Sequence, residues 1–161
     1  MLKYIRQIVL ACIVLCMSYH DIHSQERAPD FSYVDLSGSE DRLSALHGQV
    51  VYISFWASWC GPCLRNFKKY EAVRAQLASE GVILLNVNID KTEDLWHNAL
   101  KVQEISGHNV RTTDIESLQA DYQVYNIPLY EIVNRRGQLV YLPDDPDRSI
   151  LDAFRVWLWQ R

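Results

Sequence analysis

Several absences limit what this chain of 161 residues can be. It has no internal repeat, no low-complexity tract and no linker rich in proline, glycine and serine, so nothing divides it into two domains. No apolar run approaches the roughly 20 residues that a transmembrane helix needs. The chain also lacks a basic patch, and its formal net charge is −4. These features exclude a nucleic-acid-binding surface and leave one soluble globular domain as the simplest interpretation.

The first 24 residues differ in composition from the rest of the chain. Lys3 and Arg6 give a basic start, an apolar run extends from Ile8 to Met17, and Ser24 offers a small residue for cleavage. This order is typical of a signal peptide. We therefore expect residues 1–24 to direct export to the periplasm or cell envelope and residues 25–161 to form the mature domain. An uncleaved N-terminal anchor is the alternative.

Export leaves few cysteines in the chain. Of the four cysteines, Cys12 and Cys16 lie in the export segment, so the mature part keeps only Cys60 and Cys63. A disulfide gains stability from the loop that it closes, and this pair closes almost none. A zinc site would need further ligands, and the mature histidines lack ligand spacing, so we expect no metal. Redox chemistry is the better explanation of the pair.

Hydrophobic periodicity places the pair between a strand and a helix. The run 50–56 is apolar, β-branched and aromatic, which predicts a buried strand. Apolar residues then recur with helical spacing from Cys63 to Leu77, and Gly81 ends this helix. The run 82–89 predicts a second strand.

The remaining patterns predict an α/β sandwich. We expect helices over 92–104, after a Thr92 cap, and over 115–122. Strands 129–133 and 138–142 flank a loop that contains glycine, which predicts a hairpin, and Pro146 is expected to open a last helix. Alternating strands and helices are typical of this fold class.

The position at a helix N-terminus gives the two cysteines different expected roles. Unpaired N–H groups and the helix dipole stabilise a thiolate, and cysteines in C-x-x-C motifs have pKa values of about 3.5 to 7.5 rather than about 8.5. Cys60 is therefore the expected nucleophile, and Cys63 the resolving thiol. Pro62 suits the first helical turn, and Gly61 allows the backbone of a partner to approach. We expect no cofactor other than this redox-active pair.

The segment from Phe55 to Cys63, FWASWCGPC, resembles the thioredoxin superfamily. Residues 28–55 are similar to the start of its exported TlpA/ResA-like branch, and residues 122–128 to the segment before its cis-proline. The resemblance implies a thioredoxin-like fold, a central mixed sheet flanked by helices, with a TlpA-type insertion over 90–127. It also implies that Pro128 is cis and lies against the redox pair.

The neighbours of the pair have expected roles as well. The resemblance implies that the backbone of Ile127 accepts a substrate segment in β-like pairing. Trp59, next to Cys60, is expected to pack, together with Trp56 and Tyr130, and also to restrict water and shape docking.

Some positions depart from the family pattern. Ser54 stands where thioredoxins carry a buried acid, and Asn66 where ResA-like proteins often carry glutamate. A carboxylate there can accept the proton of the resolving thiol, so resolution is expected to be slow or differently assisted. Lys68 replaces a usual proline, which predicts a straighter helix. One hypothesis is that Glu131 replaces the missing acid; the alternative is an outward-facing residue.

These observations predict an exported thiol:disulfide oxidoreductase that reduces disulfides of envelope proteins. A membrane-embedded donor would re-reduce the pair. The Gly-Pro dipeptide favours this direction, because thioredoxin, which carries it, has a potential of about −270 mV against about −120 mV for the oxidant DsbA. The alternatives are a thiol oxidase on the same scaffold and a thiol-binding module for an immature partner such as apocytochrome c. A peroxidase of the peroxiredoxin type is not favoured, because Trp-Cys-Gly-Pro-Cys is not its signature.

Overall fold

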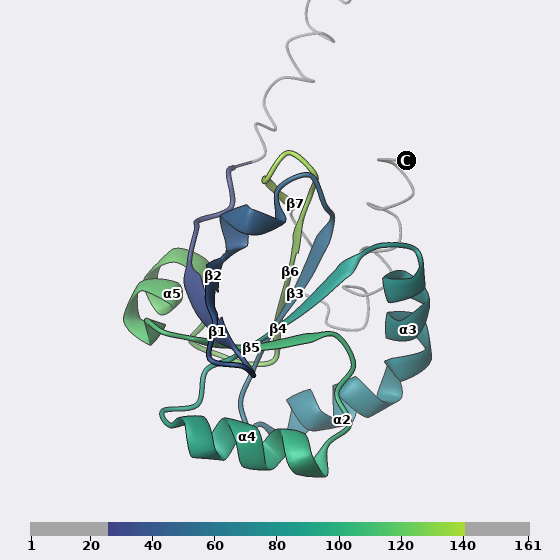
Figure 1. Ribbon diagram of the computed structural model, residues 1–161, viewed down its shortest axis with the longest axis vertical. Coiled ribbons are helices and arrows are strands. Elements are labelled where there is room, and N and C mark those ends of the chain that lie inside the picture. The colour runs from purple at the N-terminus through teal and green to yellow at the C-terminus, as the bar shows by residue number, and fades with distance from the viewer. Residues whose placement is uncertain (1–25, 141–161) are drawn as a thin grey trace, which may run out of the picture.

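Seven strands form one mixed sheet within residues 26–140, the part of the chain that the computed structural model describes (Figure 1). The strand order is β2-β1-β5-β4-β3-β6-β7. The strands are β1 Ser32–Asp35, β2 Glu40–Arg42, β3 Val51–Trp56, β4 Ile83–Asn88, β5 His108–Thr112, β6 Leu129–Val133 and β7 Leu139–Val140. The expected export segment 1–24 and the helix expected from Pro146 lie outside the described residues.

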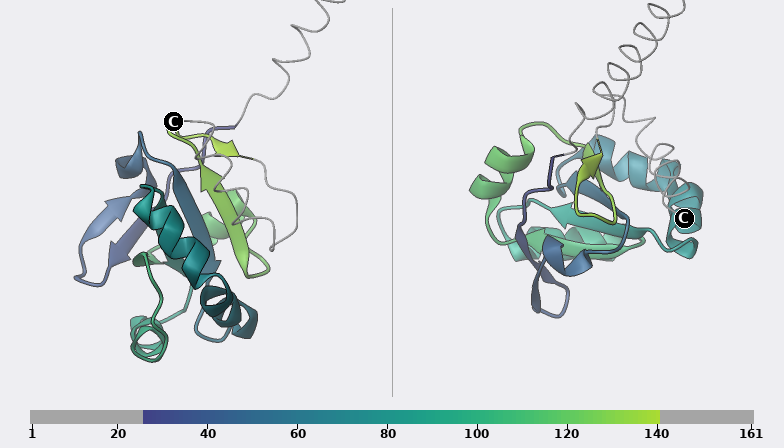
Figure 2. Two further views of the ribbon diagram at one scale, coloured as in Figure 1. Left: turned by 90° about the vertical axis from the view of Figure 1, so that its right-hand side faces the viewer. Right: turned by 90° about the horizontal axis from the view of Figure 1, so that it is seen from above.

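Four α-helices and one 3-10 helix accompany the sheet in the described part of the chain. They are η1 Leu43–Leu46, α2 Gly61–Lys69, α3 Glu71–Ser79, α4 Glu93–Val102 and α5 Ile115–Tyr122. Helix α5 lies on the opposite side of the sheet from α3, and α2 and α4 lie beside the end of the sheet at which β3 leads into α2 (Figures 1 and 2). The pairs β3–β4 and β4–β5 are parallel, and the other pairs are antiparallel. The expected mixed sheet with flanking helices is therefore confirmed.

The central strand β3 supplies the core on both faces of the sheet. All six of its residues are buried, and successive side chains point to opposite faces. Val51, Ile53 and Phe55 pack in a cluster with Leu118 and Tyr122 of α5. Tyr52 packs with Leu77 of α3 on the other face. Ser54, between Tyr52 and Trp56 in this alternation, thus faces the side of α2 and α3.

The helix after the cysteines is broken, so the prediction of one straight helix is wrong. Residues 61–69 and 71–79 form separate helices, and Tyr70 between them has φ −106° and ψ 12°. The chain changes direction there (Figure 1). The break lets α2 bury Cys63 and Phe67 while α3 buries Arg74 and Leu77. Hydrophobic spacing continues across the break, which is why the sequence pattern did not reveal it.

Several smaller differences concern the ends of elements. The strands β1, β2 and β5 were not predicted. The helix expected over 92–104 covers Glu93–Val102, and Thr92 precedes it without a side-chain capping bond. Residues 90–127 contain α4, β5 and α5. That this segment corresponds to the insertion of the TlpA branch stays a prediction.

Candidate redox site

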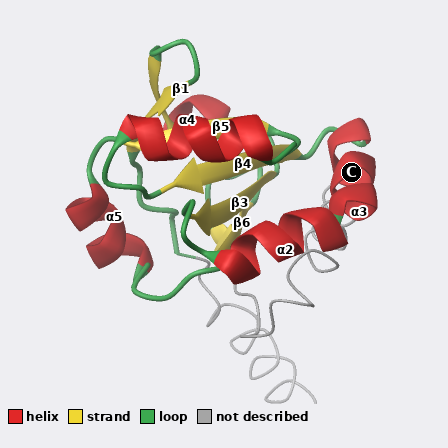
Figure 3. Ribbon diagram, turned by 90° about the horizontal axis from the view of Figure 1, so that it is seen from below, coloured by secondary structure: helices red, strands yellow, loops and turns green. Residues whose placement is uncertain are grey.

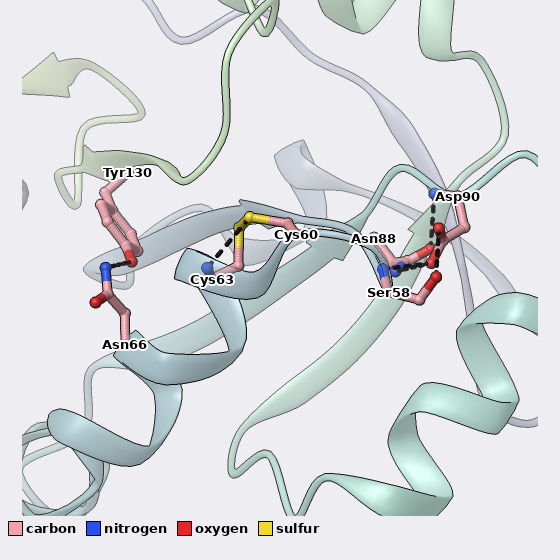
Figure 4. The surroundings of a disulfide bond; sticks show 7 residues. All are labelled: Ser58, Cys60, Cys63, Asn66, Asn88, Asp90 and Tyr130. Atoms are coloured by element: carbon pink, nitrogen blue, oxygen red, sulfur yellow. Dashed lines mark hydrogen bonds between the residues drawn. A yellow bond between two sulfur atoms is a disulfide. The ribbon is translucent and has the colours of Figure 1, made fainter.

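Cys60 and Cys63 form a disulfide at the junction of β3 and α2, as the sequence predicts (Figure 4). Cys60 occupies the N-cap position of α2, and its Sγ accepts a hydrogen bond from the backbone N–H of Cys63 at 3.2 Å. Gly61 and Pro62 form the start of the helix. Pro62 has no N–H to leave unpaired in this turn. A thiolate on Cys60 would therefore be stabilised by a backbone donor and by the helix dipole.

The exposure of the two cysteines does not distinguish their roles. Cys60 is 3% and Cys63 2% exposed in the disulfide form. The helix does distinguish them, because Cys60 precedes the first helical residue and Cys63 lies within the helix. Only Cys60 is placed to receive the free N–H groups of the first turn.

The segment before β6 lies against the redox pair. The Ile127–Pro128 peptide bond is cis, in agreement with the resemblance. Ile127 packs against the cluster that contains Cys60, Cys63 and Trp56. The chain between α5 and β6 passes the N-terminus of α2 (Figure 3).

Trp59 is a surface residue beside Cys60, so the prediction that it packs is wrong. It is 67% exposed, whereas Trp56 is fully buried. The reason is a turn, in which the N–H of Cys60 donates to the carbonyl of Ala57 at 3.0 Å. Within this turn Ser58 is partly buried, whereas Trp59 is exposed.

Asp90 holds the loop before the cysteines and was not predicted as a functional residue from the sequence. Its carboxyl group accepts hydrogen bonds from the backbone N–H and the hydroxyl of Ser58, both at 2.9 Å, and from Nδ2 of Asn88 at 2.8 Å (Figure 4). Asp90 is 4% exposed. The signal was present as polar residues, Asn88 and Asp90, at the end of an apolar strand. Asp90 is a positioning residue for the turn that carries Cys60.

The two positions that lack the family acid have different surroundings. Asn66 donates from Nδ2 to the hydroxyl of Tyr130 at 3.0 Å (Figure 4). Tyr130, predicted to pack, stacks on Tyr52 with ring centroids 5.7 Å apart. Ser54 is 1% exposed, and its hydroxyl has no hydrogen-bond partner among the described residues. Neither Ser54 nor Asn66 can accept a proton near neutral pH.

Glu131 lies on the other face of the sheet from Ser54. It pairs with Ile53 across β3 and β6, and directly opposed residues point to the same face. That face carries α5. Burial raises the pKa of Tyr122 of α5, and the charge of Glu131 raises it further. Burial also raises the pKa of Glu131 to about 7. This placement argues against Glu131 as the missing acid.

A Glu131→Gln variant is expected to gain stability relative to the parent as the pH rises. The folded state holds the Glu131 proton with a pKa of about 7, while the ordinary value of 4.5 applies to the unfolded chain. The favourable contribution of this group is therefore complete below pH 4.5 and is lost as the pH rises through 7. The free energy of unfolding of the variant minus that of the parent is expected to be higher at pH 8 than at pH 4.5 by on the order of 1 kcal/mol. This value is reduced to allow for the partial exposure of Glu131.

Urea unfolding at the two pH values measures this difference. Glu116→Gln, an exposed glutamate of α5, is the control and should not change with pH in this way. The pH profile of disulfide reduction should be the same in Glu131→Gln and the parent. A shifted profile would contradict the placement of Glu131 away from the redox pair.

No group of three or more His, Cys, Asp or Glu side chains within residues 26–140 could hold a metal ion. None of the helices described there combines the length and apolar character needed to cross a membrane.

Comparisons with known proteins agree with this geometry. A family model described as the AhpC/TSA family matches residues 24–158. The chain belongs to this family. It is 28% identical over 147 residues to the thiol-disulfide oxidoreductase ResA of Bacillus subtilis (strain 168), a match that covers 85% of this chain and 82% of that protein.

Solved structures support the same assignment of this AhpC/TSA member. A structure described as a thiol:disulfide interchange protein DsbE from Chlorobium tepidum has a TM-score of 0.67 at 27% identity and covers 80% of this chain and 96% of its own. The thioredoxin domain of a thiol-disulfide oxidoreductase from Bacteroides vulgatus has a TM-score of 0.74 at 20% identity, covers 81% of this chain and 95% of its own, and shows the fold alone. The protein is a thioredoxin-like thiol-disulfide oxidoreductase with a C-x-x-C pair.

Proposed function

We propose that the protein is an exported disulfide reductase that acts on disulfides of envelope proteins. The observation that carries the proposal is the capped position of Cys60, whose Sγ accepts the Cys63 N–H at the start of α2. The expected signal peptide, residues 1–24, supports export. A membrane-embedded donor would return the pair to the dithiol form, and apocytochrome c is one candidate among the substrates.

The chemistry follows from the different positions of the two cysteines. The Cys60 thiolate attacks one sulfur of the substrate disulfide, and the other substrate sulfur leaves and takes up a proton. Cys63 then attacks the Sγ of Cys60, which frees the second substrate sulfur and closes the Cys60–Cys63 disulfide. Two electrons pass from the protein to the substrate.

Exposed apolar side chains near the pair fit a polypeptide substrate. Trp59 is 67% and Tyr125 70% exposed, and Tyr125 lies two residues before Ile127. Aromatic side chains offer a large contact area at low cost in conformational entropy. A substrate segment in extended form would pair with the backbone at Ile127 and contact these rings.

The direction of electron flow is predicted from the residues between the cysteines. We expect the Cys60–Cys63 pair to have a potential below about −200 mV, closer to the about −270 mV of thioredoxin than to the about −120 mV of DsbA. Equilibration of the purified protein with glutathione buffers, followed by alkylation of the remaining thiols, measures it.

The same measurement distinguishes the proposed reductase from a thiol oxidase on the same scaffold. A potential above about −150 mV, with the pair isolated in the disulfide form from cells, would overturn the proposed direction. Because Cys12 and Cys16 precede the mature domain, the alkylated peptides of Cys60 and Cys63 are to be quantified separately by mass spectrometry.

A further inference from the structure

Arg74 is a buried cation on the same side of the sheet as the redox pair. It is 2% exposed, and its Nη2 donates to Oδ1 of Asn86 at 2.8 Å and to the carbonyl of Ser106 at 2.9 Å. Among residues 26–140, nothing accepts a hydrogen bond from its Nε, and no carboxylate lies within ion-pair distance. Arginine stays protonated in proteins. The described part of the chain therefore encloses a positive charge without a paired counterion.

A polar row across the sheet holds this cation. Ser54 on β3 lies between Tyr130 on β6 and Asn86 on β4, and Asn86 pairs in turn with Asn109 on β5. The Nδ2 of Asn86 donates to Oδ1 of Asn109 at 3.0 Å. The Oδ1 of Asn86 is therefore available to accept the hydrogen bond from Arg74. The row places neutral groups, and no acid, opposite the guanidinium.

The ring of Phe67 connects Arg74 to the cluster that contains the resolving cysteine. The Cζ of Arg74 is 4.9 Å from the ring centroid of Phe67. Phe67 follows Cys63 by one helical turn, and both are buried in the same cluster. One helical turn of about 5.4 Å and the 4.9 Å from the ring to the guanidinium give a separation on the order of 10 Å between the charge and the sulfur. Because buried side chains occupy this space, the solvent screens the interaction weakly.

We infer that Arg74 stabilises the thiolate of Cys63 and so assists resolution in place of the carboxylate that Ser54 and Asn66 do not provide. The inference depends on the proposed function in one respect, that Cys63 is the resolving thiol. In this role Arg74 acts through its charge on Cys63 and does not contact the substrate.

The assisted step balances without a base in the protein. The Cys63 thiol loses its proton to water, and the thiolate attacks the Sγ of Cys60 in the mixed disulfide. The Cys63–Cys60 bond forms as the bond from Cys60 to the substrate sulfur breaks, and the substrate leaves as a thiolate that takes up a proton. A carboxylate would accelerate this step by accepting the proton, whereas a cation accelerates it by increasing the thiolate fraction.

Other titratable groups near the guanidinium counter its charge only in part. Burial lowers the pKa of Arg74, and Tyr52 on β3, Glu71 on α3 and Tyr130 on β6 raise it. Of these three, only Glu71 is charged near neutral pH. Glu71 accepts a hydrogen bond from the hydroxyl of Ser106 at 3.1 Å and is partly exposed, so water screens its charge more strongly. The carboxyl group of Asp90, the other acid described near the pair, accepts hydrogen bonds from Ser58. A unit charge about 10 Å away at an effective dielectric constant near 20 changes a pKa by about one unit.

Stopped-flow reaction of the reduced protein with dithionitrobenzoate tests the inference. The full-length chain is used with Cys12 and Cys16 replaced by serine. Attack by Cys60 releases one nitrothiobenzoate at a rate that depends on reagent concentration, and resolution by Cys63 releases the second at a rate that does not. For Arg74→Met, we expect the pH midpoint of the second phase to rise by about one unit and its rate at pH 7 to fall about tenfold.

Matched variants separate charge from structure. Arg74→Lys keeps the charge and should keep the midpoint close to that of the parent, even if it unfolds more easily. Arg65→Met removes an exposed cation of α2 and should leave the midpoint in place. An unchanged midpoint in folded Arg74→Met would overturn the inference.

If Arg74→Met does not fold, Arg74→Gln decides, because an amide can still donate hydrogen bonds toward Asn86 and Ser106 but carries no charge. A midpoint about one unit above that of Arg74→Lys supports the inference. Equal midpoints in Arg74→Gln and Arg74→Lys would overturn it. The reduction potential of the pair is measured separately. A wrong direction of electron flow in the proposed function can therefore be distinguished from a wrong role for Arg74.

Discussion

A Cys63→Ser variant is expected to lose turnover in disulfide reduction by on the order of 10³ or more while still attacking its substrates. Cys60 keeps its N-cap position and its backbone donor at residue 63, because the N–H belongs to the main chain. The mixed disulfide then has no internal thiol to resolve it. The measurement is insulin reduction for turnover and non-reducing electrophoresis of the trapped adduct.

The matched control is Cys60→Ser. It should be as inactive as Cys63→Ser, but it should trap little adduct. A serine hydroxyl does not attack disulfides at neutral pH, and the remaining thiol, Cys63, lies within the helix and does not receive the free N–H groups of the first turn. Equal trapping by both variants would show that the two cysteines are interchangeable and would contradict the assignment of roles.

An Asp90→Ala variant is expected to lose about 3 kcal/mol of unfolding free energy and about tenfold or more in the rate of attack by Cys60. The change removes the acceptor for two donors of Ser58 and for Nδ2 of Asn88. Buried donors without partners are costly. The turn from Ala57 to Cys60 would then lose its fixed position. Denaturant unfolding and the concentration-dependent phase with dithionitrobenzoate measure the two effects.

Two variants control for Asp90→Ala. Asp90→Asn keeps an acceptor oxygen and should lose less on both measures. Asp35→Ala removes a carboxyl group that also accepts several hydrogen bonds, from Ser37 and Ser39, but in an exposed turn. It should leave the rate of attack unchanged. A normal attack rate in folded Asp90→Ala would contradict the role given to Asp90.

The strands β3, β4, β6 and β7 and the redox pair could be predicted from the sequence because their signals are local. The run 51–56 is buried on both faces, so its apolar character is continuous and ends where the motif begins. The C-x-x-C spacing and the proline after Gly61 define the helix start without reference to any other part of the chain.

The break at Tyr70 could not be predicted, because its cause is long-range. Helical spacing of apolar residues continues through Tyr70, and the favoured signal for a kink, proline, is absent. Arg74 of α3 donates hydrogen bonds to Asn86 on β4 and to the carbonyl of Ser106 before β5, and these bonds hold α3 against the sheet. Such contacts join residues that no local pattern connects.

The exposure of Trp59 and the face of Glu131 illustrate the same limit. An aromatic residue beside a buried strand is usually packed, but Trp59 lies in the turn closed by the Cys60–Ala57 hydrogen bond and is exposed. Glu131 lies in an apolar strand, and only the register with β3 shows which face it occupies. A shift of one residue would move it to the other face.

The most direct test of the central claim, that Cys60 attacks and Cys63 resolves, is the rate at which each cysteine of the reduced protein is alkylated as the pH changes. Iodoacetamide pulses followed by peptide mass spectrometry give both rates in one sample. We predict that Cys60 is modified first, with a midpoint below the about 8.5 of an ordinary thiol. Faster modification of Cys63, or equal rates with an ordinary midpoint for both, would contradict the account.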